Sequence, residues 1–247
     1  MAKAIPAPHV SVFNLRPGRK IGRIYEVVNK LGAGWEGEVY RIREINTGIE
    51  RAAKLFYPQR NIRNKASRFY AQKLHKLRQC SMLIQYHTEE VFAFKGLQIT
   101  ALISEYVEGD LLLDFVRAAP AGRLSAYRGL HLLYAIVKGI EEVHAMHEYH
   151  GDLHPKNIIV SRFGLRFHLK LLDFYHWHGS TKSNRQDDMI DVIRIFYEAI
   201  GGKRYYAKQP DAVKNICCGL KRSLILKKFR DIAQLREHLE MLEWDTY

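Results

Sequence analysis

The stretch His150-Gly151-Asp152-Leu153-His154-Pro155-Lys156-Asn157, followed by Leu171-Leu172-Asp173-Phe174, decides how this sequence is interpreted. A carboxylate five residues before an amide, with a second carboxylate after the next hairpin, provides one base for a hydroxyl group and two oxygen ligands for Mg²⁺. Each of these residues alone also fits an ordinary turn, because Asp and Asn are common in turns. Their order and spacing, taken together with two motifs earlier in the chain, favour chemistry over a turn.

A glycine-rich stretch lies earlier, Gly32-Ala33-Gly34-Trp35-Glu36-Gly37-Glu38-Val39, and fits the pattern G-x-G-x-x-G-x-V. It lies between two β-rich runs, whereas the glycine-rich loop of a dinucleotide-binding fold opens a helix. Glycines let the backbone approach a polyphosphate because no Cβ is in the way. Ala52-Ala53-Lys54 follows on the next predicted strand and supplies a cation for phosphate.

Taken together, these motifs resemble the protein-kinase superfamily, and the resemblance covers residues 22–243. It implies an α+β, bilobal protein-kinase-like fold, with a small antiparallel-sheet N-lobe that carries one helix and a mainly helical C-lobe. We expect an N-terminal tail at residues 1–20, the N-lobe at 21–106 and the C-lobe at 107–247, as one kinase-like domain. Runs rich in β-forming residues and apolar residues at helical spacing place the elements within these lobes. Strands are predicted at residues 24–31, 38–44, 49–56, 90–94 and 97–105, and helices at 63–78, 125–147, 188–200 and 232–242.

The resemblance also implies ATP and Mg²⁺ as cofactors and assigns roles to individual residues. Asp152 would orient or deprotonate the acceptor hydroxyl, Lys54 would hold phosphates, and Lys156 would place a cation near the γ-phosphate. Asn157 and Asp173 would bind the metal, and Asp188 would brace the catalytic loop. Ser104 would precede the hinge that binds adenine. The nucleotide-binding residues would be Leu31, Gly32, Gly34, Gly37, Val39, Ala52, Lys54, Glu105 and Val107.

Several positions depart from the family pattern. Gly151 replaces the usual arginine, so activation-loop phosphorylation is not the expected switch. The segment after Asp173 is short and lacks A-P-E, which puts peptide docking in doubt. Tyr175 replaces the glycine of D-F-G and predicts a fixed metal-ligand loop. Tyr70 stands where the family has a glutamate, so Lys54 lacks its usual partner; Glu89 or Glu90 are alternatives that the sequence leaves open.

Three functions remain open at this point. The leading hypothesis is an ATP- and Mg-dependent phosphotransferase that modifies a Ser/Thr hydroxyl of a protein. The H-G-D-L-H-P loop and the missing A-P-E support an alternative, a small-molecule or lipopolysaccharide-sugar kinase with an anionic acceptor. Tyr70 and Tyr175 motivate the third, a non-catalytic nucleotide-binding pseudokinase or scaffold.

The charge of the chain is strongly positive, because 39 Lys+Arg stand against 26 Asp+Glu among 247 residues, a net charge of +13. Residues 60–78 carry seven Lys/Arg and no acid, and residues 203–230 carry nine Lys/Arg and one Asp. These patches are compatible with contact to an acidic protein or a membrane surface, although solvated helix faces on a basic protein are the more ordinary explanation of either segment alone. No interleaved aromatic platform accompanies them, which disfavours nucleic acid.

The remaining composition excludes other classes. Three cysteines cannot form a disulfide framework, and no apolar run reaches the ~18 residues that a membrane-spanning helix needs. Prolines 6, 8 and 17 stand where a signal peptide would be apolar. A cytoplasmic location is therefore the expectation.

Overall fold

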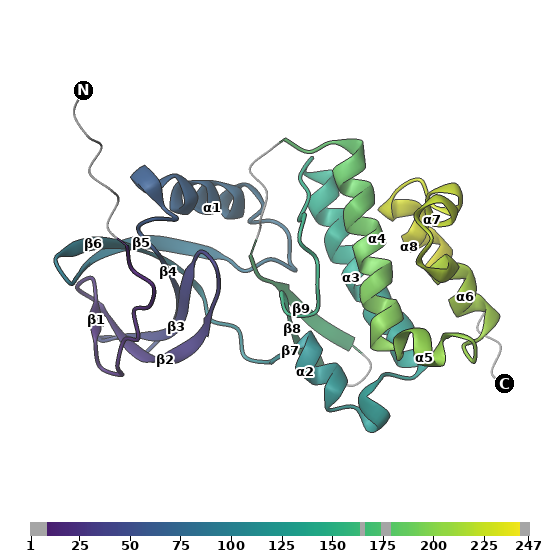
Figure 1. Ribbon diagram of the computed structural model, residues 1–247, viewed down its shortest axis with the longest axis horizontal. Coiled ribbons are helices and arrows are strands. Elements are labelled where there is room, and N and C mark those ends of the chain that lie inside the picture. The colour runs from purple at the N-terminus through teal and green to yellow at the C-terminus, as the bar shows by residue number, and fades with distance from the viewer. Residues whose placement is uncertain (1–8, 164–165, 174–178, 243–247) are drawn as a thin grey trace. The chain divides into compact units, whose positions relative to one another are not determined.

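The computed structural model describes residues 9–163, 166–173 and 179–242 (Figure 1). The chain divides into two compact units: the first takes the chain up to Gln79 and again Ile84–Val107, and the second takes Cys80–Leu83 and the chain from Glu108 onward. The change of unit after Val107 lies one residue from the expected boundary between the lobes. Among the described residues, no helix combines the length and the apolar character needed to cross a bilayer.

The first unit is built on a six-stranded antiparallel sheet in the order β1-β2-β3-β4-β6-β5. Its strands are β1 (Lys20–Ile21), β2 (Tyr25–Ala33), β3 (Gly37–Glu44), β4 (Glu50–Phe56), β5 (Tyr86–Phe94) and β6 (Leu97–Glu105). The five predicted strands are confirmed, and the two-residue β1 is an addition. Among the described residues of this unit there is one α-helix, α1 (Lys65–Lys76). It follows a 3₁₀ turn and packs beside β5 and β6, which confirms the helix predicted at 63–78 (Figure 1).

Side chains alternate between the two faces of this sheet, as in any β-strand. One face forms the core of the unit, to which β3 contributes Tyr40 and Ile42 and β4 contributes Ala53 and Leu55, all fully buried. The alternate residues of the same strands point to the other face, among them Lys54 on β4. The expected nucleotide-binding residues of β3 and β4 are therefore on the face opposite this core.

From residue 9 onward the N-terminal segment packs into this core, whereas the sequence predicted an N-terminal tail at residues 1–20. Val10 and Phe13 are 7% and 4% exposed, and the ring of Phe13 stacks on Tyr57 with 5.3 Å between centroids. The fully buried Glu38 accepts hydrogen bonds from the backbone N–H groups of Phe13 (3.1 Å) and Asn14 (3.3 Å). A buried carboxylate requires such donors, so the segment and Glu38 stabilise each other.

The second unit is mainly helical, with α3 (Ala126–Ala145) and α4 (Lys182–Ala199) lying side by side (Figure 1). Gly129 permits this close packing, because a Cβ there would lie 2.5 Å from a side-chain carbon of Ile200. A small sheet in the order β7-β8-β9 lies in the same unit. The other elements are β7 (Asp110–Leu111), β8 (Ile158–Phe163), β9 (Arg166–Leu171), α2 (Leu112–Arg117), α5 (Gly202–Tyr206), α6 (Asp211–Cys217), α7 (Arg222–Lys228) and α8 (Ile232–Glu240).

The three helices predicted for the second half are confirmed, with one difference in extent. Helix α4 begins at Lys182, six residues before the predicted start at Asp188. Thr181 is its N-cap: its hydroxyl accepts from Asn184 N (3.2 Å), and Asn184 Oδ1 accepts from Thr181 N (3.1 Å). This reciprocal pair satisfies N–H groups that the first turn of a helix leaves without partners.

Candidate active site

The glycine-rich stretch forms the hairpin between β2 and β3, as its position between two strands predicted. Gly34 N donates to Gly37 O at 2.9 Å and closes the turn. Gly37 stands where only glycine fits, because a Cβ there would lie 1.9 Å from the carbonyl oxygen of Leu55. The tip of the hairpin is thus held close against β4.

Three predicted nucleotide-binding residues share one face of the sheet. Lys54 on β4 pairs with Val39 on β3 and with Leu102 on β6, and Ala52 lies two residues before Lys54. Leu31 differs from them, because Lys30 pairs with Tyr40 and Gly32 with Val39, which makes Leu31 the extra residue of a β-bulge. Its side chain is exposed.

Lys54 has an acidic partner that the sequence did not identify. Its Nζ lies 2.8 Å from Oε2 of Glu36, the residue just before Gly37 in the hairpin. The hydroxyl of Tyr70 on α1 donates to the same oxygen at 2.9 Å. The ammonium group also lies 4.1 Å from the centre of the Tyr70 ring, within the range of a cation–π contact. Lys54 therefore has an acidic partner, Glu36, and Tyr70, at the position of the family's glutamate, contacts both members of this ion pair.

The two acids that the sequence offered as alternatives lie on β5, and one of them has a clear place. A Cβ on Gly22 would meet Glu90 Oε2 at 2.1 Å, so this carboxylate packs against the turn after β1. Glu36 stands inside the glycine-rich motif, but only the pairing of β3 with β4 brings it to Lys54, so the sequence alone did not indicate it.

The expected hinge follows β6. Glu105 is tied to Gln85: its N–H donates to Gln85 O at 2.9 Å, and its Oε1 accepts from Gln85 N at 3.0 Å. Ser104 before it is buried, and Val107 after it is half-buried where the first unit ends. These bonds fix the backbone direction at the start of the hinge.

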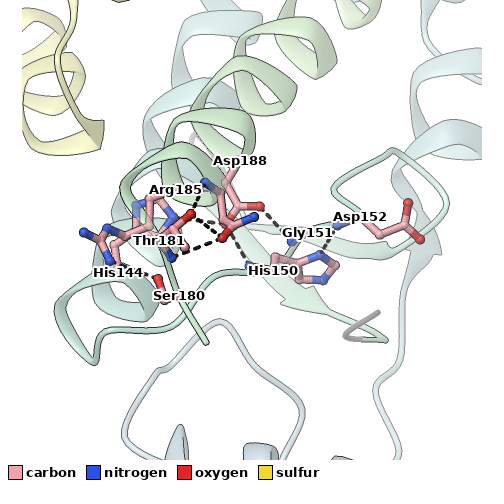
Figure 2. A network of polar contacts seen from close by, with 9 residues as sticks. His144, His150, Gly151, Asp152, Ser180, Thr181, Arg185 and Asp188 are labelled. Carbon is pink, nitrogen blue, oxygen red and sulfur yellow. Dashed lines mark hydrogen bonds and ion pairs between the residues drawn. The ribbon is translucent and has the colours of Figure 1, made fainter. Parts of the chain in front are cut away.

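In the second unit, the catalytic loop is braced by Asp188, as the resemblance predicted. Asp188 has no exposed surface and accepts from His150 N at 2.7 Å and from Gly151 N at 2.8 Å. Nε2 of His144 lies 3.0 Å from the same carboxylate. Figure 2 shows Asp188 between His144 and the backbone of His150 and Gly151, while the carboxylate of Asp152 points away from this network.

His150 connects the catalytic loop to the residue before Asp173. Its Nδ1 lies 3.3 Å from the N–H of Asp152, and its Nε2 lies 3.0 Å from the carbonyl oxygen of Leu172. Because Nδ1 accepts here, the proton of the neutral ring belongs on Nε2, which donates to Leu172. The His150 ring thus fixes the backbone at Asp152 and at Leu172, the residue before Asp173.

Asp152 and Asn157 are in direct contact. The Asn157 amide nitrogen donates to Asp152 O at 2.9 Å and lies 3.4 Å from Asp152 Oδ2. His154 Nε2 lies 3.6 Å from the same Oδ2. The Asp152 side chain is 47% exposed, so solvent and substrate have access to it.

Asp173 lies next to Asn157 along the small sheet. Asn157 precedes β8, Asp173 follows β9, and Leu172 N donates to Asn157 O at 2.8 Å. Asp173 has φ of +44°, a left-handed conformation uncommon for a residue other than glycine. Tyr175, with its predicted effect on this loop, lies outside the described residues.

These residues fit a magnesium ion. Because the Asn157 nitrogen donates to Asp152, its Oδ1 is the atom left to face a metal, and Asp173 adds a carboxylate. Within the described ranges, no group of three or more His, Cys, Asp or Glu side chains forms a ready metal site. Mg²⁺ commonly takes one or two protein carboxylates together with substrate phosphates, which matches a two-residue donor set. Lys156, the third predicted catalytic residue, is exposed in the same loop, and its N–H donates to His154 Nδ1 at 3.2 Å.

An antiparallel-sheet unit with a glycine-rich hairpin and a strand lysine, joined to a helical unit with a braced Asp/Asn loop, defines a bilobal kinase fold. The comparison with protein families agrees: the model described as "Protein kinase domain" matches residues 25–213. The chain therefore belongs to the protein kinase domain family.

Individual relatives are also protein kinases. The chain is 30% identical over 168 residues to death-associated protein kinase 2 of Homo sapiens, covering 65% of this chain and 44% of that protein. It is 29% identical over 158 residues to CBL-interacting protein kinase 21 of Oryza sativa subsp. japonica, covering 64% and 29%. Cyclin-dependent kinase C-2 C of Arabidopsis thaliana is 26% identical over 175 residues, covering 71% and 26%. The matches span less than half the length of each of these relatives.

Proposed function

We propose that this protein is an active phosphotransferase that moves the γ-phosphate of ATP, with Mg²⁺, to a Ser/Thr hydroxyl of a protein. The observation that carries the proposal is the contact of Asp152 with Asn157 in a loop whose backbone is held by the buried Asp188. A chain without catalytic activity has no need of this arrangement. The protein kinases among its relatives support a protein as the acceptor.

Each residue has a bounded task in this reaction. Phosphoryl transfer passes through a loose transition state, so catalysis comes mainly from positioning and from cations near the phosphates. Lys54 would hold the phosphates, Asp152 would orient the hydroxyl and take up its proton, and Lys156 would offset charge near the γ-phosphate. Asn157 and Asp173 would hold Mg²⁺, which when bound neutralises charge on the transferred group.

A second acceptor class has specific support. Helix α4 begins at Lys182, so only eight residues separate it from Asp173. A protein kinase normally docks its peptide with this segment, and eight residues leave little chain for that purpose. A small-molecule or lipopolysaccharide-sugar kinase with an anionic acceptor is therefore the alternative.

The exposed basic residues bear on partners in both cases. Most Lys and Arg of the 60–78 segment are exposed in the first unit, and those of 203–230 belong to the second. We propose that these basic residues contact an acidic protein or an anionic membrane surface. The three cysteines are free thiols, which supports a reducing compartment such as the cytoplasm.

The test is transfer of labelled phosphate from ATP in the presence of Mg²⁺, with casein and histones as acceptors. We expect Asp152→Asn to lower the rate by roughly 10²–10⁴-fold, since the amide cannot accept the proton. Asp211→Asn is the matched control, because Asp211 is 92% exposed and pairs only with a lysine one turn along its own helix in the described contacts. Its rate should equal that of the unmodified protein.

The acceptor fractions separate the alternatives. Label on casein or histone supports the protein acceptor, whereas label only after addition of metabolites or a lipopolysaccharide extract supports the small-molecule kinase. If no fraction is labelled and ATP does not shift the melting temperature, both enzyme proposals fail and the non-catalytic scaffold remains.

A further inference from the structure

We propose that Glu36 and Tyr70 together position Lys54, with the acid supplied by the glycine-rich hairpin and a phenol supplied by the helix. This inference rests on the proposed function, because it concerns how Lys54 is held for phosphate. It assigns positioning roles to two residues that the sequence motifs leave without one.

The hairpin tip that carries Glu36 is anchored on neighbouring structure. Tyr57 N donates to Glu36 O at 2.9 Å, which joins the tip to the end of β4. The guanidinium of Arg60 stacks over the Trp35 ring, 3.8 Å from its centre. With Gly37 packed against the Leu55 carbonyl, these contacts fix the backbone on both sides of Glu36. The carboxylate is thus presented from a held backbone and not from a free loop.

The ion pair itself is sheltered. The Lys54 and Glu36 side chains are 14% and 15% exposed, and 2.8 Å separates Nζ from Oε2. Solvent screens such a pair less than an exposed one, so the carboxylate holds the ammonium group more effectively. Lys54 is therefore fixed before any phosphate binds.

Tyr70 replaces an acid with a different kind of support. It is 4% exposed on α1, and its hydroxyl shares the Glu36 oxygen with Lys54 while its ring lies beneath the ammonium group. No acid occurs in α1 or anywhere in residues 60–78. The helix thus acts on Lys54 through a neutral ring and hydroxyl, and the negative charge comes from the hairpin.

A charge-relocation experiment tests the arrangement. Glu36→Gln removes the charge, Tyr70→Phe removes only the hydroxyl, and Glu36→Gln/Tyr70→Glu moves the acid onto the helix. Glu26→Gln is the matched control, because Glu26 pairs with Arg43 at 2.7 Å on the same sheet, away from the hairpin tip. The melting temperature of every variant is recorded, so that a loss of activity is compared only among folded proteins.

We expect Glu36→Gln to lower kcat by about 10–100-fold with less than a threefold change in KM for ATP, and Tyr70→Phe to lower kcat by about 2–5-fold. If Glu36→Gln lowers kcat a hundredfold, the variant with the relocated acid should have a kcat at least tenfold higher than that of Glu36→Gln. The kcat of Glu26→Gln should match that of the unmodified enzyme. The proposal is overturned if Glu36→Gln keeps its kcat, or if it lowers KM for ATP without lowering kcat, because the carboxylate would then compete with phosphate for Lys54.

A second readout needs no activity. Labelling of Lys54 by an amine-reactive acylating reagent, without nucleotide and mapped by mass spectrometry, should rise several-fold in Glu36→Gln and fall again in the relocated variant. Equal labelling of Lys54 in all variants contradicts the positioning role. The two proposals can fail separately. If the unmodified protein transfers no phosphate but the labelling of Lys54 still rises in Glu36→Gln, the proposed function fails and the ion-pair arrangement stands.

Discussion

Glu38 and Asp191 are carboxylates whose surroundings move their pKa values in opposite directions. Burial by itself would raise the pKa of Glu38, but hydrogen bonds from Tyr40, from Lys30 and from two backbone N–H groups outweigh it and hold the pKa below its ordinary value. At Asp191, burial raises the pKa to about 6, the nearby carboxylates of Asp188, Asp187 and Asp152 act in the same direction, and Arg194 opposes them. The two pKa values move in opposite directions because Glu38 accepts several hydrogen bonds that favour its charged form, whereas Arg194 alone, within the described part of the chain, opposes burial at Asp191.

The lowered pKa of Glu38 predicts sensitivity to acid. A carboxyl group whose pKa is lower in the folded state adds stability above its unfolded pKa, about 4.3, and this stability is lost as the pH falls through the folded pKa. We expect Glu38→Gln to be less stable at pH 7 by about 1–3 kcal/mol and to lose less stability on acidification. Urea unfolding followed by circular dichroism between pH 3 and 7 measures both; parallel curves for the two proteins would contradict the assignment.

The raised pKa of Asp191 predicts the opposite slope. A carboxyl group with a raised folded pKa costs stability once the folded protein must ionise it, so its contribution falls as the pH rises from about 4 to about 6. Asp191→Asn removes this cost together with the Arg194 contact at 2.6 Å, and because the Arg194 side chain is 51% exposed this contact contributes at most about 1 kcal/mol. We expect the stability of the variant relative to the unmodified protein to increase across this pH range, measured by thermal melts in matched buffers. A constant difference would show that Asp191 titrates normally.

At the scale of elements, the N-terminal segment completes the core of the first unit. Phe13 lies against Tyr57 and meets Phe94 edge-on at 5.2 Å between ring centroids. We expect Phe13→Ala to lower the free energy of unfolding by about 3–5 kcal/mol, because it removes a buried aromatic ring. The neighbouring Val12 is 49% exposed, so Val12→Ala is the matched control and should change stability by less than about 0.5 kcal/mol. Equal effects of the two substitutions, measured by urea unfolding, would mean that the segment is not packed in solution.

Sequence patterns predicted the elements that carry their own signals. Runs rich in β-forming residues marked the five long strands, and the pattern of apolar residues marked the helices α3, α4 and α8. The segment that contains Val10 and Phe13 has no period, and prolines surround it, so its burial depends on partners far along the chain. The two-residue strands β1 and β7 likewise exist only through pairing with longer neighbours.

The candidate site was predictable to the same degree. Asp152, Asn157 and Asp173 are indicated by two sequence motifs, and the structure brings them to one end of the small sheet. The Lys54 partner required the fold, because β3 and β4 must pair before Glu36 reaches the lysine. The earlier start of α4 had a local signal, Thr181 followed three residues later by Asn184, which is a less familiar pair than Ser/Thr with Glu/Gln.

At the scale of the whole molecule, all three cysteines belong to the second unit, so thiol chemistry reports on that unit alone. Burial raises the pKa of Cys80 to about 11 and that of Cys217 to about 12, so both thiols stay protonated at pH 8. We expect them to react with an alkylating reagent at least 100-fold more slowly than glutathione in native buffer, and at a similar rate after unfolding. Cys218 is partly exposed and should react first, as peptide mapping would show. Rapid native labelling of Cys217 would contradict its burial.

The second unit takes a short piece of chain from the middle of the first, and this has a consequence for synthesis on the ribosome. Cys80–Leu83 leaves the ribosome early, yet Leu171 N donates to Met82 O at 2.7 Å and Gly139 packs against Met82. Domains generally fold as units in the order in which they are made. The first unit has its last strand once residue 105 has emerged, but these four residues must wait for α3 and then β9. The nascent first unit therefore carries an undocked loop for a further 60 or so residues of translation, and a chaperone that binds apolar segments would meet Met82 and Leu83 during that interval.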